Sequence, residues 1–282
     1  MTNNFKSKLM SILIVICFVA GSLLLLYPIY ANYMYSKMAS EAQQSYEANN
    51  AATDAASKNS QLAAASSYNA SLNPTVLIDP FSSGTQQESV DKGYYDILNV
   101  TSADNISGVM GFIEIPKIDV NLPVFHGTSD EVLNVGAGHL IGSSLPVGEN
   151  GSHAVLTGHS GLPDKKLFTD LTKLETGDQF FITVLDNKMA YQIDDIRIVE
   201  PNDTSWFSIE PDQDLVTLLT CTPVGINDHR LLVTGHRIPY EEANTNVQPA
   251  VDWYKILVYL GIGITAISIL IWFWKKHQRN KN

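Results

Sequence analysis

Apolar residues follow three patterns along the 282-residue chain. Residues 9–29 form an apolar run with one Tyr and one Pro near its end, and residues 256–274 form a second run without a charge. Between them, from about Val109, short apolar runs are separated by Gly, Pro, Asn and Asp. Long uncharged runs predict helices in lipid, whereas short runs between turn signals predict strands. We therefore expect a strand-rich domain between two apolar helices.

The run at residues 256–274 has the length of a transmembrane helix. Its 19 residues, at about 1.5 Å rise per residue, cover the roughly 30 Å hydrocarbon layer of a bilayer. Aromatic residues at the lipid interface and basic residues on the cytoplasmic side are typical of such helices. Both kinds flank this run: Trp253, Tyr254, Trp272, Trp274, Lys275, Lys276, Arg279 and Lys281.

The run at residues 9–29, with Lys6 and Lys8 before it, is interpreted as an uncleaved signal anchor. A cleaved signal peptide has the same length and basic start, and it stays open as the alternative although no clear small-x-small cleavage site follows. With an anchor at each end, we expect a cell-membrane protein with both termini in the cytosol. Residues from about 31 to 252 would then lie outside.

The charge of this external part excludes one class of partner. Residues 31–254 hold 11 Lys and Arg against 29 Asp and Glu, a net charge of −18. Nucleic acid requires a basic surface for its phosphates, so we expect no nucleic-acid partner. The same balance favours a soluble body that is repelled from anionic lipid.

Six short apolar runs carry the strand pattern: VMGFIEI, AVLTG, FFITVL, MAYQIDDIRIV, LVTLLTC and RLLVTGHRI. Their spacing is typical of an all-β sandwich or barrel. The helical pieces at 128–138 and 167–174 are too few for alternating βα units. The domain boundaries that we predict are 1–38 for the N-terminal anchor, 39–107 for a helical or stalk segment, 108–242 for the β domain and 243–282 for the C-terminal helix and basic tail.

The segment before the β domain has two parts. Residues 39–70 are rich in Ala, Ser, Gln and Asn, a composition that makes a helix or a spacer rather than a core. Residues 73–84, NPTVLIDPFSSG, contain two prolines and cannot form a long regular element. Their apolar side chains would be out of place in an exposed linker, so we expect a groove on the main domain to cover them.

Cys221 is the residue with the clearest chemical potential. The other cysteine, Cys17, lies in the first apolar run, so the external part cannot form a disulfide within itself. A buried inert thiol and a reactive one are both open at this point. Cys221 ends the strand DLVTLLTC, and Arg230 begins the next one after a loop with Pro and Gly. Antiparallel pairing would make the thiol and the guanidinium cross-strand neighbours.

His159 follows another strand, in the sequence HAVLTGHSGLP. A histidine on a loop at a strand end is a candidate base, and a Cys with an ordinary pKa near 8.5 needs one at neutral pH. The chain has seven histidines, so a chance position near a strand end is the competing interpretation.

These residues carry a resemblance to a known family. TLLTC at 217–221, followed by Arg230, resembles the sortase signature, and TGHSG around His159 resembles the sortase histidine motif. GAGHLIGSSLPVG and IEIPKIDVNLPVFHG are similar to segments of the pilin-polymerising, class C sortases. The resemblance covers residues 75–240 and the C-terminal helix, and it implies an eight-stranded sortase β-barrel with short helices.

The resemblance also implies a reaction that needs no metal and no cofactor. Cys221 would attack the Thr–Gly carbonyl of an LPXTG-like sorting signal and form a thioester. His159 would protonate the departing amine and later accept a proton from the incoming amine. Arg230 would donate hydrogen bonds to the substrate carbonyl or the oxyanion. The implied partners are pilins that carry the signal and a pilin Lys, or a cell-wall amine, as acceptor.

Asp79, Pro80 and Phe81 resemble the lid of class C sortases, which lies over the active site within residues 75–84. The resemblance places the acid near the Arg and the aromatic ring near the Cys. The chain departs from many relatives in having Ser82-Ser83-Gly84 after the aromatic residue rather than Gly directly. An ordinary packed loop is the competing interpretation.

Other signals are interpreted as structural. We assign no catalytic role to His126, His153 or His236, and no zinc site to His153 with His159 and Cys221, because zinc ligands cluster at characteristic spacings. The glycines in GAGHLIG are one residue too widely spaced for a dinucleotide fingerprint, and we interpret them as a turn.

Two other functions compete with the transpeptidase. One is a membrane-anchored cysteine peptidase that releases surface proteins by hydrolysis, and the other is a β-domain adhesin with an incidental thiol. The adhesin gives no reason for Cys221, Arg230 and His159 to lie at three strand ends beside a lid-like segment. The hydrolase uses the same residues, so the resemblance alone separates it from the transpeptidase.

Overall fold

The computed structural model describes residues 2–72, 77–81, 92–99, 108–240, 243, 247, 249 and 251–279. The chain divides into two compact units, Met1–Tyr35 with Val251–Asn282, and Ser36–Ala250, and each is described by itself.

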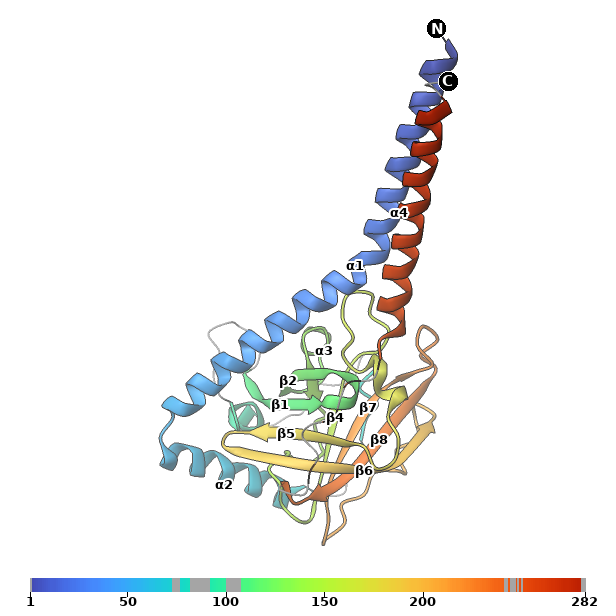
Figure 1. Cartoon of the computed structure of the whole chain (residues 1–282). Helices are drawn as coiled ribbons and strands as arrows, with labels where there is room; N and C mark the ends of the chain where they lie inside the picture. The colour runs from blue at the N-terminus through green and yellow to red at the C-terminus, as the bar shows by residue number, and fades with distance from the viewer. Residues whose placement is uncertain are drawn as a thin grey trace. The chain divides into compact units, whose positions relative to one another are not determined.

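The first unit holds the two apolar helices, which lie side by side (Figure 1). Helix α1 is Thr2–Ala52, whose first part belongs here, and helix α4 is Trp253–Arg279. The hydroxyl of Tyr254 on α4 donates to the carbonyl of Leu25 on α1 at 3.2 Å. Both helices are long and apolar enough to cross a bilayer, because each contains an 18-residue stretch of high mean hydropathy, 2.9 in α1 and 2.4 in α4. The two predicted apolar helices are confirmed.

The second unit is built around a closed eight-stranded barrel (Figure 1), as the family resemblance implies and in agreement with the strand-rich pattern. The order around the barrel is β1-β2-β3-β4-β7-β8-β6-β5. The strands are β1 Val109–Ile115, β2 Val120–His126, β3 Ala137–His139, β4 Ser152–Thr157, β5 Gln179–Val184, β6 Asn187–Val199, β7 Asp214–Thr222 and β8 His229–Ile238. The short helices are α3 (Asp130–Leu133) and the 3-10 turns η1 (Lys92–Asp96), η2 (Pro116–Ile118) and η3 (Thr169–Lys173).

Two of the eight strands have no counterpart among the six predicted runs. Strand β2 contains Pro123, which is unusual inside a strand, and strand β3 has only three residues with Gly138 at its centre, so both carry weaker strand signals than the other six. The predicted turn in GAGHLIG is therefore only partly correct. Gly138 lies within β3, while Gly142 has a φ of 92° in the turn after it.

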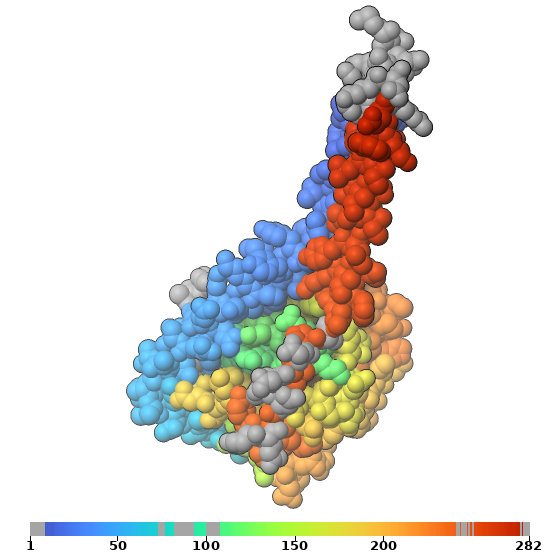
Figure 2. Space-filling model, in the orientation of Figure 1, coloured from blue at the N-terminus to red at the C-terminus, as the bar shows by residue number. Residues whose placement is uncertain are grey.

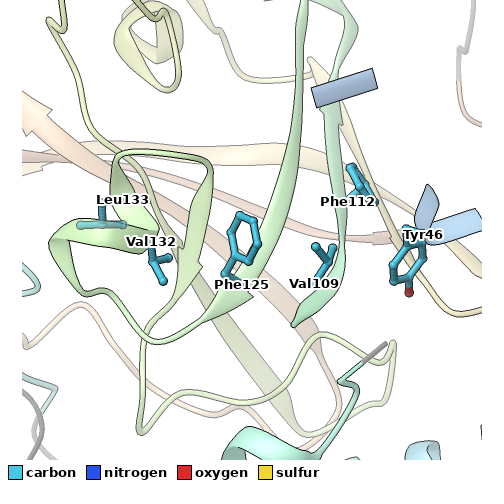
Figure 3. Packing of buried hydrophobic residues seen from close by; sticks show 6 residues of the cluster. All are labelled: Tyr46, Val109, Phe112, Phe125, Val132 and Leu133. Atoms are coloured by element: carbon cyan, nitrogen blue, oxygen red, sulfur yellow. The ribbon is translucent and has the colours of Figure 1, made fainter. Parts of the chain in front are cut away.

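The core of the barrel includes a residue from α1. Tyr46 packs edge-to-face on Phe112 of β1, with ring centroids 5.4 Å apart. Its hydroxyl accepts from the backbone N–H of Leu185 at 2.8 Å and donates to the Met110 carbonyl at 3.2 Å. Figure 3 shows Tyr46 and Phe112 in one buried cluster with Val109, Phe125, Val132 and Leu133. Burial of this aromatic pair fixes the second part of α1 to the barrel.

Helix α2, Ala55–Ser71, also lies on the barrel. Lys58 forms an ion pair with Asp186 at 2.9 Å, and the side-chain amide of Asn69 pairs with both backbone groups of Leu145, donating at 3.1 Å and accepting at 2.7 Å. Figure 2 shows the blue and cyan helices covering one side of the second unit. Residues 39–70 are helical as predicted, but they pack on the barrel instead of forming a free spacer.

Candidate active site

Strands β7 and β8 bring the thiol and the guanidinium together. They pair antiparallel with Cys221 directly opposite Arg230, which confirms the cross-strand prediction. All nine residues of β7 are buried, because neighbours lie on both sides of the strand and on both of its faces. Cys221 is 8% exposed and Arg230 is 6% exposed, so both groups are shielded from water.

Strand β4 carries His159 to the same end of the barrel. Strands β4 and β7 are parallel, with Thr157 opposite Leu219, so their carboxyl ends emerge side by side. The backbone N–H of Gly158 donates to the Leu219 carbonyl at 3.1 Å, and the Thr220 hydroxyl donates to the Gly158 carbonyl at 2.7 Å. His159 follows two residues after Thr157, as Cys221 follows two residues after Leu219, so imidazole and thiol lie at matching positions.

Two small residues hold the His159 loop in place. A Cβ atom at Gly158 would lie 2.8 Å from the ring of Phe168, so glycine is required for this packing. The Ser160 hydroxyl, which is buried, donates to the Cys221 carbonyl at 2.6 Å. Sequence reasoning gave Ser160 no role, because its position next to His159 does not reveal the partner of its hydroxyl.

The predicted lid residues Asp79, Pro80 and Phe81 lie against this end of the barrel. Asp79 receives two hydrogen bonds of 2.7 Å from Arg230, one from Nε and one from Nη2. The Arg230 Cζ lies 5.2 Å from the centroid of the Phe81 ring, and the rings of Phe81 and His159 have centroids 5.5 Å apart. The acid therefore lies at the Arg as expected, and the aromatic ring contacts the Arg and the His. Residues 75, 76 and 82–84 of the predicted lid lie outside the described residues.

Leu77, four residues before Phe81, extends the covered segment. It is 4% exposed and packs in a cluster with Leu140, Val155, Leu219 and Leu232. The expectation that something covers the apolar residues of segment 73–84 is thus confirmed for Leu77, while Ile78 is 50% exposed. A bidentate Arg–carboxylate pair and an apolar anchor together hold the segment.

The remaining predicted residues have structural partners. His126 contacts the Ile97 carbonyl at 2.6 Å, His153 contacts the Ser208 carbonyl at 2.7 Å, and His236 contacts Asp194 at 2.9 Å. These contacts agree with the interpretation of all three as structural.

The comparisons with known proteins support the same assignment. Residues 113–238 match the sortase domain model. Sortase C-1 of Streptococcus pneumoniae is 46% identical, with a TM-score of 0.64 over 71% of this chain and 99% of that chain. The chain belongs to the sortase family. The pilus-related sortase C of Group B Streptococcus is 44% identical over 71% of this chain and 98% of that chain, also with a TM-score of 0.64.

A curated relative, sortase D of Bacillus subtilis, is 34% identical over 45% of this chain. This sortase chain spans about half to two thirds of the length of the first curated relatives it matches, with 63% of that sortase D and 52% of sortase A of Streptococcus agalactiae covered. The solved structures are sortase C enzymes, which agrees with the class C resemblance.

The surroundings of Cys221 and His159 in this sortase site favour the uncharged forms of the thiol and the imidazole. Burial raises the pKa of the Cys221 thiol; the Arg230 guanidinium opposes this rise and the Asp79 carboxylate adds to it. Burial also lowers the pKa of His159. A thiol, an imidazole and a guanidinium in one shielded place are the groups that thiol-based acyl transfer requires. With Asp79 on Arg230, the arrangement stabilises the neutral thiol and the neutral imidazole.

Proposed function

We propose that this sortase is a membrane-anchored transpeptidase that cleaves an LPXTG-like sorting signal between Thr and Gly and joins the Thr carbonyl to a pilin Lys. The observation that carries the proposal is the cross-strand pair of Cys221 and Arg230 beside the His159 loop. Support for a pilin substrate comes from the solved sortase C structures, one of which is described as pilus-related.

In the first half-reaction, the Cys221 thiol gives its proton to His159, and the resulting thiolate attacks the Thr carbonyl carbon. The C–N bond to Gly then breaks, a thioester forms on Cys221, and His159 donates a proton to the departing amine. In the second half-reaction, the acceptor amine attacks the thioester and loses a proton to His159. The C–S bond breaks, an amide bond forms and the thiolate returns.

Arg230 stabilises the oxyanion of both tetrahedral intermediates. Its guanidinium offers five donors in a planar fork, and Asp79 now receives two of its hydrogen bonds. The carboxylate of Asp79 thus occupies the donors that a developing oxyanion would use. The resting site is therefore closed, and the lid must leave before the sorting signal binds.

We place this reaction at the surface of the cell membrane. Helices α1 and α4 carry the spans, and the basic residues in the last turns of α4 and beyond it favour a cytosolic C-terminus. The catalytic barrel then lies outside, where pilins and cell-wall amines meet it. Anchoring of proteins to a cell-wall amine is the alternative use of the same thioester, and hydrolysis by water is the other.

The thioester itself can be tested by intact-mass spectrometry. Wild-type protein mixed with a sorting-signal peptide should gain the mass of the peptide up to Thr, and Cys221→Ala should gain none, because the adduct requires the thiol. His159→Ala and Arg230→Ala should reduce adduct formation at least about a hundredfold. An adduct on Cys221→Ala would remove Cys221 from its role, and unimpaired rates in the other two variants would remove theirs.

A further inference from the structure

A second pocket lies on the same barrel face as Cys221. It has a volume of about 250 Å³, and its lining includes Leu215, Leu232, Thr234 and Trp206. None of the described lid residues, 77–81, lines it. Trp206 also lines the pocket that contains Leu77 and Asp79, so the two pockets meet at this side chain.

The strand register makes the two pockets parts of one groove. Opposite residues of paired strands share a face, as do alternate residues along a strand. Cys221 pairs with Arg230, Leu219 with Leu232, and Thr217 with Thr234. These three pairs form one continuous outward row. Leu232 lies in the apolar cluster with Leu77 and also lines the second pocket, so the lid covers the groove near the thiol and leaves its continuation uncovered.

A β-bulge brings two carboxylates to this continuation. Asp194 and Asp195 both line the pocket, although neighbouring residues of a regular strand point to opposite faces. The pairing of β6 with β8 shifts between Ile193 and Asp195, and Asp194 is the inserted residue. A bulge re-aims a side chain. Arg197, which lines the same pocket, is paired with Asp195, and Asp194 contacts His236 at 2.9 Å; the three charged lining side chains, Asp194, Asp195 and Arg197, sum to −1.

The opposite wall is rigid. The Ser208 carbonyl can only accept, so His153 Nδ1 carries the proton and donates to it at 2.7 Å, while Nε2 accepts from the Thr217 hydroxyl at 2.8 Å. The His153 ring stacks on Phe207 with centroids 4.9 Å apart. His153 is 2% exposed, and its two hydrogen bonds tie the loop that carries Trp206 to strands β4 and β7. These contacts hold the loop of Trp206 against the barrel.

The lid indicates what kind of ligand the groove accepts. Residues 77–81 are a peptide segment without helix or strand structure, anchored at Leu77 and at Asp79. They occupy the half of the groove nearest the thiol. A peptide that replaced the lid and continued along the groove would enter the second pocket.

We infer that the second pocket binds the two or three residues amino-terminal to the sorting pentapeptide, with a Lys or Arg among them paired to Asp194 and Asp195. This inference rests on the proposed function. Thr217 and Leu215 lie four and six residues before Cys221, or roughly 13 and 20 Å along the strand. Four extended residues before the scissile bond span about 13 Å, so the residues before them reach the pocket.

The test uses full-length enzyme in detergent and three peptides. Each carries the same pentapeptide, preceded by three residues that contain Lys, Ala or Glu, and single-turnover acylation of Cys221 is followed by mass. The Lys peptide should acylate about fivefold faster than the Glu peptide at subsaturating concentration, because a partly exposed ion pair contributes about 1 kcal/mol at most. High salt should reduce the difference.

Two variants locate the effect. In Asp194→Asn/Asp195→Asn the preference for Lys over Glu should disappear, whereas Asp119→Asn, at the turn between β1 and β2, should retain it. A photoreactive residue three positions before the pentapeptide Leu should crosslink to residues 194–197 or 206–208 in wild-type enzyme.

The outcomes separate this inference from the proposed function. No adduct with any peptide would overturn the proposed function itself. Equal acylation of the three peptides by wild-type enzyme, or a Lys preference that survives in the double Asn variant, would overturn the inference and leave the transpeptidase intact. Crosslinks outside the second pocket would also overturn it.

Discussion

The ion pair between Asp79 and Arg230 controls the resting state of the thiol. Both side chains are almost completely buried, with 5% and 8% exposure, so water screens the pair poorly. The pair ties up donors on Arg230 and places a negative charge near Cys221, where it raises the pKa of the thiol further. A charge that destabilises the thiolate lowers the reactivity of the thiol.

Replacing Asp79 by Asn should therefore activate the thiol. The substitution removes the negative charge and the bidentate pair, so the pKa of Cys221 should fall. Alkylation by iodoacetamide, measured from pH 6 to 10, should show a midpoint at lower pH and a faster rate at pH 7. Asp119→Asn is the matched control and should follow the wild-type curve. An unchanged midpoint and rate in Asp79→Asn, at equal fold stability, would identify segment 77–81 as an ordinary packed loop.

The sequence predicted those site contacts that follow from strand geometry. Cys221 and Arg230 were paired correctly because period-two alternation and a short hairpin loop fix the register. Ser160 was not assigned, and Leu77 was expected to be covered without its partners being named, since a loop hydroxyl and a side chain on a distant segment find their partners only through tertiary packing. The contact of Asp79 with Arg230 was predicted from the family resemblance, because no local rule places Asp79 next to a residue 151 positions later.

At the scale of elements, strand β7 connects the site to the opposite end of the barrel. It ends near Cys221 and begins with Asp214, which is buried and accepts from Tyr191 at 3.1 Å to each carboxylate oxygen. Burial raises the pKa of Asp214 to about 6, although the contacts with Tyr191, Arg237 and Ser152 stabilise the carboxylate and lower this pKa. The folded state thus holds the proton of this carboxyl more tightly than the unfolded chain does.

This shift has a definite sign for stability. A folded pKa above the unfolded value stabilises the protein below about pH 4, and the contribution is lost as pH rises through about 6. The side chain of Asp214→Asn cannot titrate. The difference in free energy of unfolding between Asp214→Asn and wild type should therefore shift in favour of the variant by on the order of 2 kcal/mol from pH 4 to pH 8. Urea unfolding at both pH values measures this difference, and any constant cost of the substitution cancels. A difference independent of pH would show that Asp214 ionises normally.

Elements were predictable where their own sequence carries the signal. The six runs with β-branched and aromatic residues became strands, whereas β2 and β3 were missed because Pro123 and Gly138 obscure them. Residues 39–70 were helical as their Ala content suggested. Their packing was missed, because it depends on single polar contacts, such as Lys58 with Asp186, that leave no periodic pattern.

At the scale of the whole molecule, the account requires a defined membrane topology. Protease added to intact protoplasts should digest the region from about 31 to 252 and leave tags at both termini protected, because the basic residues at the C-terminal end of α4 favour the cytosol. Lysed protoplasts are the control, in which both tags should be lost. A C-terminal tag that is accessible in intact protoplasts would contradict the proposed orientation.

The central claim is that an amine, rather than water, resolves the thioester on Cys221. A shielded acyl-enzyme gains most from a positioned nucleophile. In the most direct measurement, full-length enzyme is mixed with a sorting-signal substrate and an excess of a pilin domain, and the product is mapped by tandem mass spectrometry. The Asp79→Asn enzyme, whose site should be open, is used in parallel. The account predicts an isopeptide bond between the Thr carbonyl and a pilin Lys, and no such product with Cys221→Ala. Hydrolysed substrate as the sole product, with the pilin Lys in excess, would contradict it and identify a peptidase.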